Sequence, residues 1–184
     1  MIISFQGGES VKISQGDLSL AVNPTSNRGN ADLSLMSSGG SDVEGKGFVI
    51  SGPGEYEVKD ISVKGFLSEG KGGKINTVYL INFEGLNLCF LGSIANPTLN
   101  AETVENLEDI DILFVPVDTL EPAAAYKLAV SLEPSLIIPM LYTPESLKKF
   151  IKESGEESEQ MDKLVVKKKD LEGKEGDIVV LKEE

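Results

Sequence analysis

The chain has 184 residues, 40% of them hydrophobic and 26% charged, which is typical of one soluble globular domain with a sizeable core. Thirty acidic residues against 17 basic ones give a net charge of −13, so the chain lacks the basic surface that a phosphate-backbone partner requires. It contains one cysteine and no histidine. An internal disulfide, a Ser-His-Asp or Cys-His catalytic site and a thiolate zinc cage are therefore excluded.

The first half of the chain predicts short strands joined by Gly, Asn and Ser turns. A Gly/Ser-rich loop is expected at 37–47 and a mobile Gly/Lys surface loop at 68–74. The expected strands cover residues 2–5, 10–14, 18–22, 33–36, 48–50, 56–58 and 61–66.

The second half predicts strands alternating with helices, which favours an α/β arrangement with mixed sheets and helices on the outside. Asn100 is expected to cap a helix over 101–107, and residues 112–115 and 136–140 form continuous apolar runs typical of buried strands. A polar loop or helix end is expected at 153–160. The remaining elements are a hairpin of 77–83 with 86–91, helices at 122–132 and 144–151, and closing strands at 164–166 and 178–181.

Three local features bear on partners and location. Cys89 lies in the apolar run 88–91, which indicates a small buried hydrophobe, with a nucleophile as the alternative. The run Lys167–Lys169 is interpreted as a solvated strand end, so no nucleic-acid partner is expected. No stretch approaches the roughly 18 apolar residues of a membrane span, and no leader pattern opens the chain. We therefore expect a cytoplasmic protein that does not associate with membranes.

Five segments from Gly52 onward occur in an order that resembles the metallo-β-lactamase superfamily, close to its branch of ascorbate-6-phosphate-lactonase-like hydrolases. The resemblance implies an α/β fold, a four-layer αββα sandwich of that type reduced in size, with one domain spanning residues 1–184. In the family, two metals lie in a cleft at the strand ends. The segments are 52–58, 76–80, 90–93, 111–117 and 137–142.

The metal ligands of that family do not carry over. By resemblance, histidines are replaced at Ser38, Gly40, Val43, Phe90 and Leu141. Ser93 stands in place of a bridging aspartate, Asn23 in place of the aspartate of an Asp-Pro pair, and only Asp42 matches a ligand. The resemblance therefore implies a chain with no metal and no cofactor.

The apolar replacements suggest how a metal site could be lost. Stripping ions from an intact ligand set would leave clustered carboxylates and unpaired polar groups away from water, which is costly. We expect Val43, Phe90 and Leu141 to converge and fill the former metal cavity, since buried apolar side chains contribute roughly 1.5–3 kcal/mol each. The alternative is that the three are unrelated core residues.

Several polar residues near the former site keep more than one interpretation. Asp42 fits a relic ligand, a loop cap beside Gly39 and Gly40, or a weak magnesium or calcium contact. Asn23, Asp118 and Tyr142 are cleft candidates, whereas Asp118 and Glu121 also fit an ordinary turn and helix start.

Three classes of function follow. The first is a non-catalytic pseudo-hydrolase that binds an unknown ligand or protein partner. The second is a hydrolase with a re-equipped, zinc-independent cleft, in which Ser38, Ser93, Asp42, Asp118 or Tyr142 acts without imidazole. The third is a structural subunit that assembles with itself or with an active relative.

Overall fold

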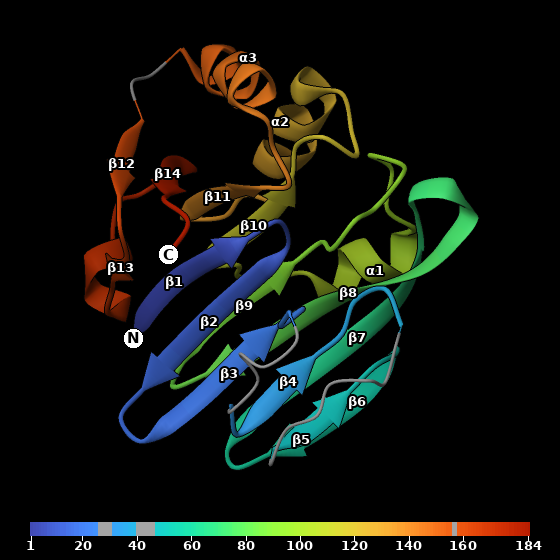
Figure 1. Cartoon of the computed structure of the whole chain (residues 1–184), viewed down its shortest axis with the longest axis vertical. Coiled ribbons are helices and arrows are strands. Elements are labelled where there is room, and N and C mark those ends of the chain that lie inside the picture. Colours follow the sequence, from blue (N-terminus) through green and yellow to red (C-terminus); the bar gives the residue numbers. More distant parts are fainter. Residues whose placement is uncertain (26–30, 40–46, 156–157) are drawn as a thin grey trace.

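The computed structural model describes residues 1–25, 31–39, 47–155 and 158–184, and within them two β-sheets lie face to face (Figure 1). The first sheet has the strand order β13-β1-β2-β3-β4-β5. Strands β1, β2 and β3 form an antiparallel meander, and β4 and β5 follow as strands parallel to β3. The strands are β1 (Ile2–Gly7), β2 (Ser10–Gln15), β3 (Leu18–Val22), β4 (Leu33–Leu35), β5 (Phe48–Ile50) and β13 (Leu164–Val165).

The second sheet has the order β12-β14-β11-β10-β9-β8-β7-β6. Strands β6 to β9 are antiparallel, whereas β9, β10, β11, β14 and β12 run parallel to one another. The carboxyl ends of β9, β10 and β11 therefore meet at one edge. The strands are β6 (Gly54–Val58), β7 (Ile61–Gly70), β8 (Lys74–Phe83), β9 (Leu86–Phe90), β10 (Ile112–Pro116), β11 (Leu136–Met140), β12 (Glu159–Met161) and β14 (Asp177–Leu181).

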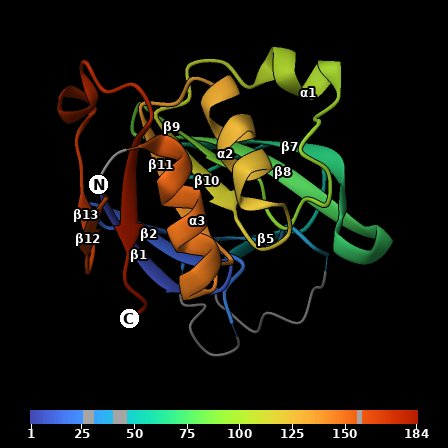
Figure 2. The ribbon, with the colours of Figure 1, turned by 90° about the horizontal axis from the view of Figure 1, so that it is seen from above.

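The described α-helices cover the outer face of the second sheet, where α2 (Pro122–Ser131) and α3 (Pro144–Ser154) lie side by side (Figure 2). Helix α1 (Ala101–Asn106) begins at Asn100, whose side chain accepts the Thr103 N–H at 2.7 Å, as predicted. Thr143 and Ser146 form a reciprocal capping box at the start of α3. Each of these two helix starts is therefore fixed by local sequence.

Two cores hold these layers together. The inner core lies between the sheets and contains the stacked rings of Phe90 and Phe114, whose centroids are 3.9 Å apart. The outer core lies between the second sheet and the helices and contains Cys89 and Phe150. Cys89 is buried as expected, and burial raises the pKa of its thiol well above the ordinary value. Because a nucleophilic cysteine acts as its thiolate, this environment is unsuited to that role.

The expected α/β class with mixed sheets is confirmed. In the described part of the chain the α-helices cover the second sheet only. The fold therefore has fewer helices there than a full αββα sandwich. No helix in the described segments is long and apolar enough to cross a membrane.

Three local predictions were wrong in whole or in part. Residues 68–74 do not form a long loop, because β7 and β8 continue their pairing to Gly70 and Lys74 around a 3₁₀ turn, η1 (Lys71–Gly73). Within 153–160 the expected helix end is present, because α3 ends at Ser154 and Gly155 caps it. The expected loop is wrong for the polar edge strand β12, which pairs with β14. Lys167–Lys169 is not a strand end, since a 3₁₀ turn, η2 (Lys168–Leu171), covers most of it.

The ion pair of Lys168 with Asp111 generates a stability prediction. Asp111 is buried, accepts both Lys168 Nζ contacts at 2.7 and 2.8 Å, and also accepts the Asn87 N–H. Lys168→Met should lower the free energy of unfolding by about 2 kcal/mol, because a charge-assisted hydrogen bond to a buried carboxylate is lost. Urea denaturation measures this change. Lys169→Met, at the exposed neighbouring lysine, is the control and should change stability by less than about 0.5 kcal/mol; equal losses in both variants would contradict the prediction.

Candidate functional site

A cleft of about 680 Å³ opens at the edge where the carboxyl ends of β9, β10 and β11 meet the first sheet. Its walls come from the loops that follow these strands, from the β1–β2 turn, from the loop after β4, and from the β7–β8 turn. Strand ends of this kind are the usual place for ligand sites in α/β proteins. The lining residues are Phe5, Gly8, Glu9, Ser38, Lys71, Lys74, Ser93, Asp118, Thr119, Leu141, Tyr142 and Glu183.

Most of the described site candidates come together here. Ser38, Ser93 and Leu141 line the cleft, as do the cleft candidates Asp118 and Tyr142. Asn23 lies beside the cleft, through its hydrogen bond to the lining residue Glu9. Gly40, Asp42 and Val43 lie outside the described residues.

Phe90 is the described candidate that lies elsewhere. Its ring is fully buried in the inner core against Phe114 and is not part of the cleft lining. Leu141, by contrast, is half-buried on the cleft wall. The expected plug is therefore wrong for its two described members, and the cleft between the surrounding loops is open. The alternative, that Phe90 is an ordinary core residue, fits its position.

Asn76 organises the wall that carries Ser93. Its buried amide donates to Ser68 Oγ at 2.8 Å and to the Leu91 carbonyl at 2.9 Å, and its oxygen accepts the Ser93 N–H at 3.0 Å. The intervening Gly92 has φ +65°, and a Cβ there would collide with the Asn76 oxygen and lie 3.0 Å from Ser37 Cβ. Glycine is required because only its backbone allows this close approach.

A second network fixes the wall on the first sheet. Asn23 has φ 47°, a conformation that asparagine tolerates, and its amide donates to Glu9 at 3.0 Å and to Ser37 Oγ at 2.8 Å. Ser37 N–H donates back to Asn23 Oδ1 at 2.8 Å, and the Ser37 carbonyl accepts from Thr77 N–H at 2.7 Å. The network thus reaches from β3 to β8 and ties the two sheets together beneath the cleft.

Glu9 is the carboxylate closest to this network. Burial raises its pKa above the ordinary value, while hydrogen bonds from the Ser93 and Ser37 hydroxyls act in the opposite direction. A half-buried carboxylate between two hydroxyls can accept hydrogen bonds from a ligand and can take up a proton more readily than an exposed glutamate.

Leu141 occupies a left-handed backbone conformation, with φ 46°. Its N–H donates to the Gly8 carbonyl at 3.0 Å, and its carbonyl accepts the Asp118 N–H at 2.7 Å. A leucine in this region is strained by about 1 kcal/mol or more, so the surrounding hydrogen bonds must hold it there.

Charged side chains of both signs line the rim. Lys71 and Lys74 extend from the β7–β8 turn, and no described carboxylate forms an ion pair with either ammonium group. Asp118 and Glu183 supply carboxylates elsewhere on the rim. Near Glu183, Phe5 and Tyr142 stack with centroids 6.1 Å apart, and Tyr142 donates to the Leu181 carbonyl at 3.2 Å.

The donor set does not fit the two metals held by the family that the sequence resembles. The described positions hold the hydroxyls of Ser38 and Ser93 and the hydrocarbon side chains of Phe90 and Leu141. Neutral hydroxyls and hydrocarbon groups are not the ligands that zinc selects. Across the described ranges, no three aspartate, glutamate or cysteine side chains converge as a metal-binding group. We therefore derive no catalytic step through a metal.

Sequence reasoning missed several residues of the site: Glu9, Asn76, Lys71, Lys74 and Glu183. Glu9 follows Gly7 and Gly8 in a turn, and Asn76 opens a segment that the resemblance includes, so both carried a weak signal. The two lysines were assigned to a mobile loop, so no fixed position beside the cleft was predicted for them. Nothing in the local sequence brings Glu183 to the cleft, because its approach depends on the pairing of β14.

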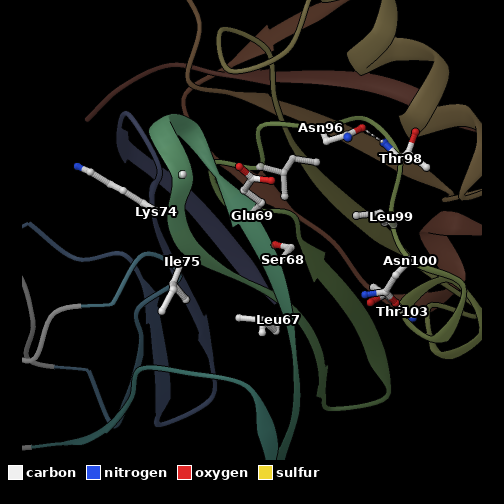
Figure 3. Close-up of a pocket in the computed structure, with 12 residues that line it drawn as sticks. Leu67, Ser68, Glu69, Lys74, Ile75, Asn96, Thr98, Leu99, Asn100 and Thr103 are labelled. Carbon is white, nitrogen blue, oxygen red and sulfur yellow. Dashed lines mark hydrogen bonds between the residues drawn. The ribbon is translucent and has the colours of Figure 1, made fainter.

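A second cavity, of about 500 Å³, lies on the other side of the β7–β8 hairpin and is lined in part by Leu67, Ile75 and Leu99 (Figure 3). Its polar groups serve local structure: Asn100 caps α1, and Asn96 accepts the Thr98 N–H at 2.8 Å. Lys74 lines both cavities, and Figure 3 shows its side chain directed away from Asn100. The first cleft is therefore the better candidate site.

Comparison with known proteins places this geometry in a family. A family model described as a β-lactamase superfamily domain matches residues 2–141. A comparison with curated proteins found no match.

Solved structures share the fold over the whole chain. A protein of Thermotoga maritima, described as a candidate zinc-dependent hydrolase of the metallo-β-lactamase superfamily, is 27% identical with a TM-score of 0.84, over 100% of this chain and 99% of that one. A candidate metal-dependent hydrolase of Parabacteroides distasonis is 17% identical with a TM-score of 0.68, over 99% and 93%. A metallo hydrolase of Ignicoccus hospitalis is 12% identical with a TM-score of 0.66, over 98% and 94%. The latter two share the fold alone.

Gly92→Ala tests the close approach of the Asn76 amide. The substitution adds a clash with this amide to the strain of a left-handed alanine, so it should destabilise the protein by about 3 kcal/mol. Gly85→Ala is the matched control. Gly85 has φ +76°, but apart from its chain neighbours no atom of the described residues lies within 4 Å of the position that a Cβ would take, so the substitution should cost only about 1 kcal/mol. Thermal and urea unfolding measure both; similar losses would remove the steric role of Gly92.

Glu9→Gln tests the raised pKa of Glu9. A carboxyl whose folded pKa exceeds its unfolded value makes the protein lose stability as pH rises through the interval between the two. The glutamine variant should therefore melt at a higher temperature than the unsubstituted protein near pH 7, with the advantage shrinking towards about pH 4. Glu57→Gln, at an exposed glutamate of β6, removes the same charge as a control. A pH-independent difference, or an equal gain in the control, would contradict the prediction.

Proposed function

The chain belongs to the β-lactamase superfamily, and we propose that it is a non-catalytic, metal-independent member whose cleft binds a small polar ligand. One observation carries the proposal: the cleft at the strand ends is open, while its described former ligand positions hold serine and leucine. The site therefore keeps the space and polar surface for a ligand without the donors for a dication.

The arrangement of the loops supports binding over a purely structural role. A chain kept only for assembly gains nothing from a cleft of about 680 Å³ lined by hydroxyls, carboxylates and ammonium groups. The volume lies in the range usual for small-molecule sites, in which placed polar groups fix the orientation of the ligand. The hydrogen bonds of Asn76 and Asn23 hold the walls in place, so the cleft is preorganised for its ligand.

A hydrolase with a re-equipped cleft is the second candidate, and the contact of Ser93 with Glu9 favours it. A carboxylate of raised pKa beside a hydroxyl can in principle take its proton during attack on an ester or lactone. By resemblance, Leu141 stands where the family has a histidine. Its alkyl side chain cannot carry a second proton during the reaction. The Thermotoga maritima relative is described as a candidate zinc-dependent hydrolase, and the donors described here do not support a zinc-dependent mechanism in this chain.

Metal analysis of purified, tag-free protein tests the proposal. We expect zinc, iron and manganese to remain far below one equivalent per chain, both as purified and after incubation with each metal followed by desalting. A zinc enzyme carried through the same procedure is the control. One equivalent of any of the three metals would overturn the metal-independent assignment.

A hydrolysis screen separates the two candidates. Lactones, esters and phosphodiesters should be turned over no faster than by buffer, with or without chelator. Activity that persists in chelator and disappears in Ser93→Ala or Ser38→Ala, while Ser62→Ala on β7 keeps it, would establish the second candidate instead.

A further inference from the structure

The lysines of the cleft are separated from Glu183 along the sheet. Lys71 and Lys74 stand at the β7–β8 turn, and Glu183 follows β14. In the second sheet, β8 and β14 are separated by β9, β10 and β11. Four strand spacings of about 4.8 Å place these ends about 19 Å apart at the backbone. The cleft is therefore elongated, with the two lysines at one end and Glu183 at the other. The carboxylates of Glu9 and Asp118 lie between these ends.

The cationic end is fixed by backbone contacts. Lys71 N–H donates to the Ser93 carbonyl at 3.1 Å, and Ala95 N–H donates to the Glu69 carbonyl at 3.0 Å. A further bridge pairs Gly70 with Ile94. The turn is thus docked on the loop that carries Ser93, and its two ammonium groups have no described carboxylate as a partner. Such groups can bind a carboxylate of a ligand.

The anionic end combines a carboxylate with an aromatic wall. Glu183 pairs with Phe5 at the backbone level, and the Phe5 and Tyr142 rings stack beside it. Burial and the negative charge of Glu183 both raise the pKa of Tyr142, so its phenol stays neutral. A carboxylate beside aromatic rings is a favourable environment for an ammonium group.

The middle of the cleft offers hydrogen-bonding groups suited to amides. Ser93 and Ser38 contribute hydroxyls, and the carboxylates of Glu9 and Asp118 contribute acceptors. Thr119 Oγ1 is buried and has no hydrogen-bond partner among the described residues, although Thr119 lines the cleft. An unpartnered buried hydroxyl is costly, and rotation about its Cα–Cβ bond would offer it to a ligand.

We infer that the cleft binds a short peptide of two or three residues with free termini, its carboxylate at Lys71 and Lys74 and its ammonium group at Glu183. Side chains extend into the cleft from both ends, and the remaining span fits a few residues at about 3.4 Å each. This inference rests on the proposed binding function and names its ligand class.

Isothermal titration of the full chain with trialanine tests the inference. Free trialanine should bind at least about tenfold more tightly than its N-acetylated and its C-amidated forms, because each blocked form leaves one end unpaired. Inorganic phosphate, as a simple anion, should bind more weakly than trialanine. Equal binding of a blocked form, stronger binding of phosphate, or no binding of trialanine at millimolar concentration would overturn the inference.

Variants assign the two ends. The Lys71→Met/Lys74→Met double variant should lose the preference for the free carboxylate over the amide, and Glu183→Gln should lose the preference for the free ammonium group. The control, Lys148→Met/Lys152→Met, removes the same charge from exposed positions of α3 and should retain both preferences. Unchanged preferences in the cleft variants would overturn the assignment.

Thr119→Val is a variant that keeps the fold. It removes an unpaired buried hydroxyl at nearly constant volume, so the melting temperature without peptide should hold or rise, while trialanine affinity falls severalfold. Unchanged affinity would exclude the hydroxyl from the site. Failure of every peptide measurement in a metal-free protein would overturn the peptide inference alone, whereas stoichiometric metal would overturn the proposed function.

Discussion

The amide of Asn76 is fully buried and makes three hydrogen bonds, to Ser68, Leu91 and Ser93. It joins the β7–β8 hairpin to the loop after β9, and the adjacent Thr77 N–H continues the connection to Ser37 on the opposite sheet. A buried amide with its donors and acceptor satisfied is rigid, because breaking any bond leaves an unpaired group away from water. Both walls of the cleft are therefore anchored at Asn76 and its neighbour Thr77. The lysines of the β7–β8 turn are positioned by the same hydrogen bonds.

The walls and the chemistry of this cleft are specified by different atoms. Main-chain groups and the amides of Asn23 and Asn76 set the shape, whereas exposed and half-buried side chains such as Ser38 and Lys71 set what the cleft can recognise. This division explains how the chain can share a fold over its whole length with proteins described as metal-dependent hydrolases while presenting hydroxyls and ammonium groups. Membership of the superfamily therefore predicts the fold of this chain better than it predicts a reaction.

Local sequence predicted the elements whose signal is itself local. The continuous apolar runs of β10 and β11 and the cap at Asn100 were sufficient, because burial on both faces and helix capping act within a few residues. The tip of the β7–β8 hairpin was missed, since its Gly and Lys residues look like a loop until the pairing partner is known. Ser38, Ser93 and Leu141, three positions that the resemblance named, line one cleft. It misplaced Phe90, because an apolar residue at a former ligand position can turn into the core as readily as towards the cavity.

The left-handed turn at Leu141 is held entirely by main-chain bonds, to Gly8 on one side and Asp118 on the other. None of these bonds involves the leucine side chain. The loop therefore keeps its path whichever residue it carries, provided the left-handed strain is tolerated. The side chain at position 141 can therefore be exchanged without changing the loop. A metal-binding or an inert side chain fits the same backbone conformation, so the chemistry at this position can change while the fold stays the same.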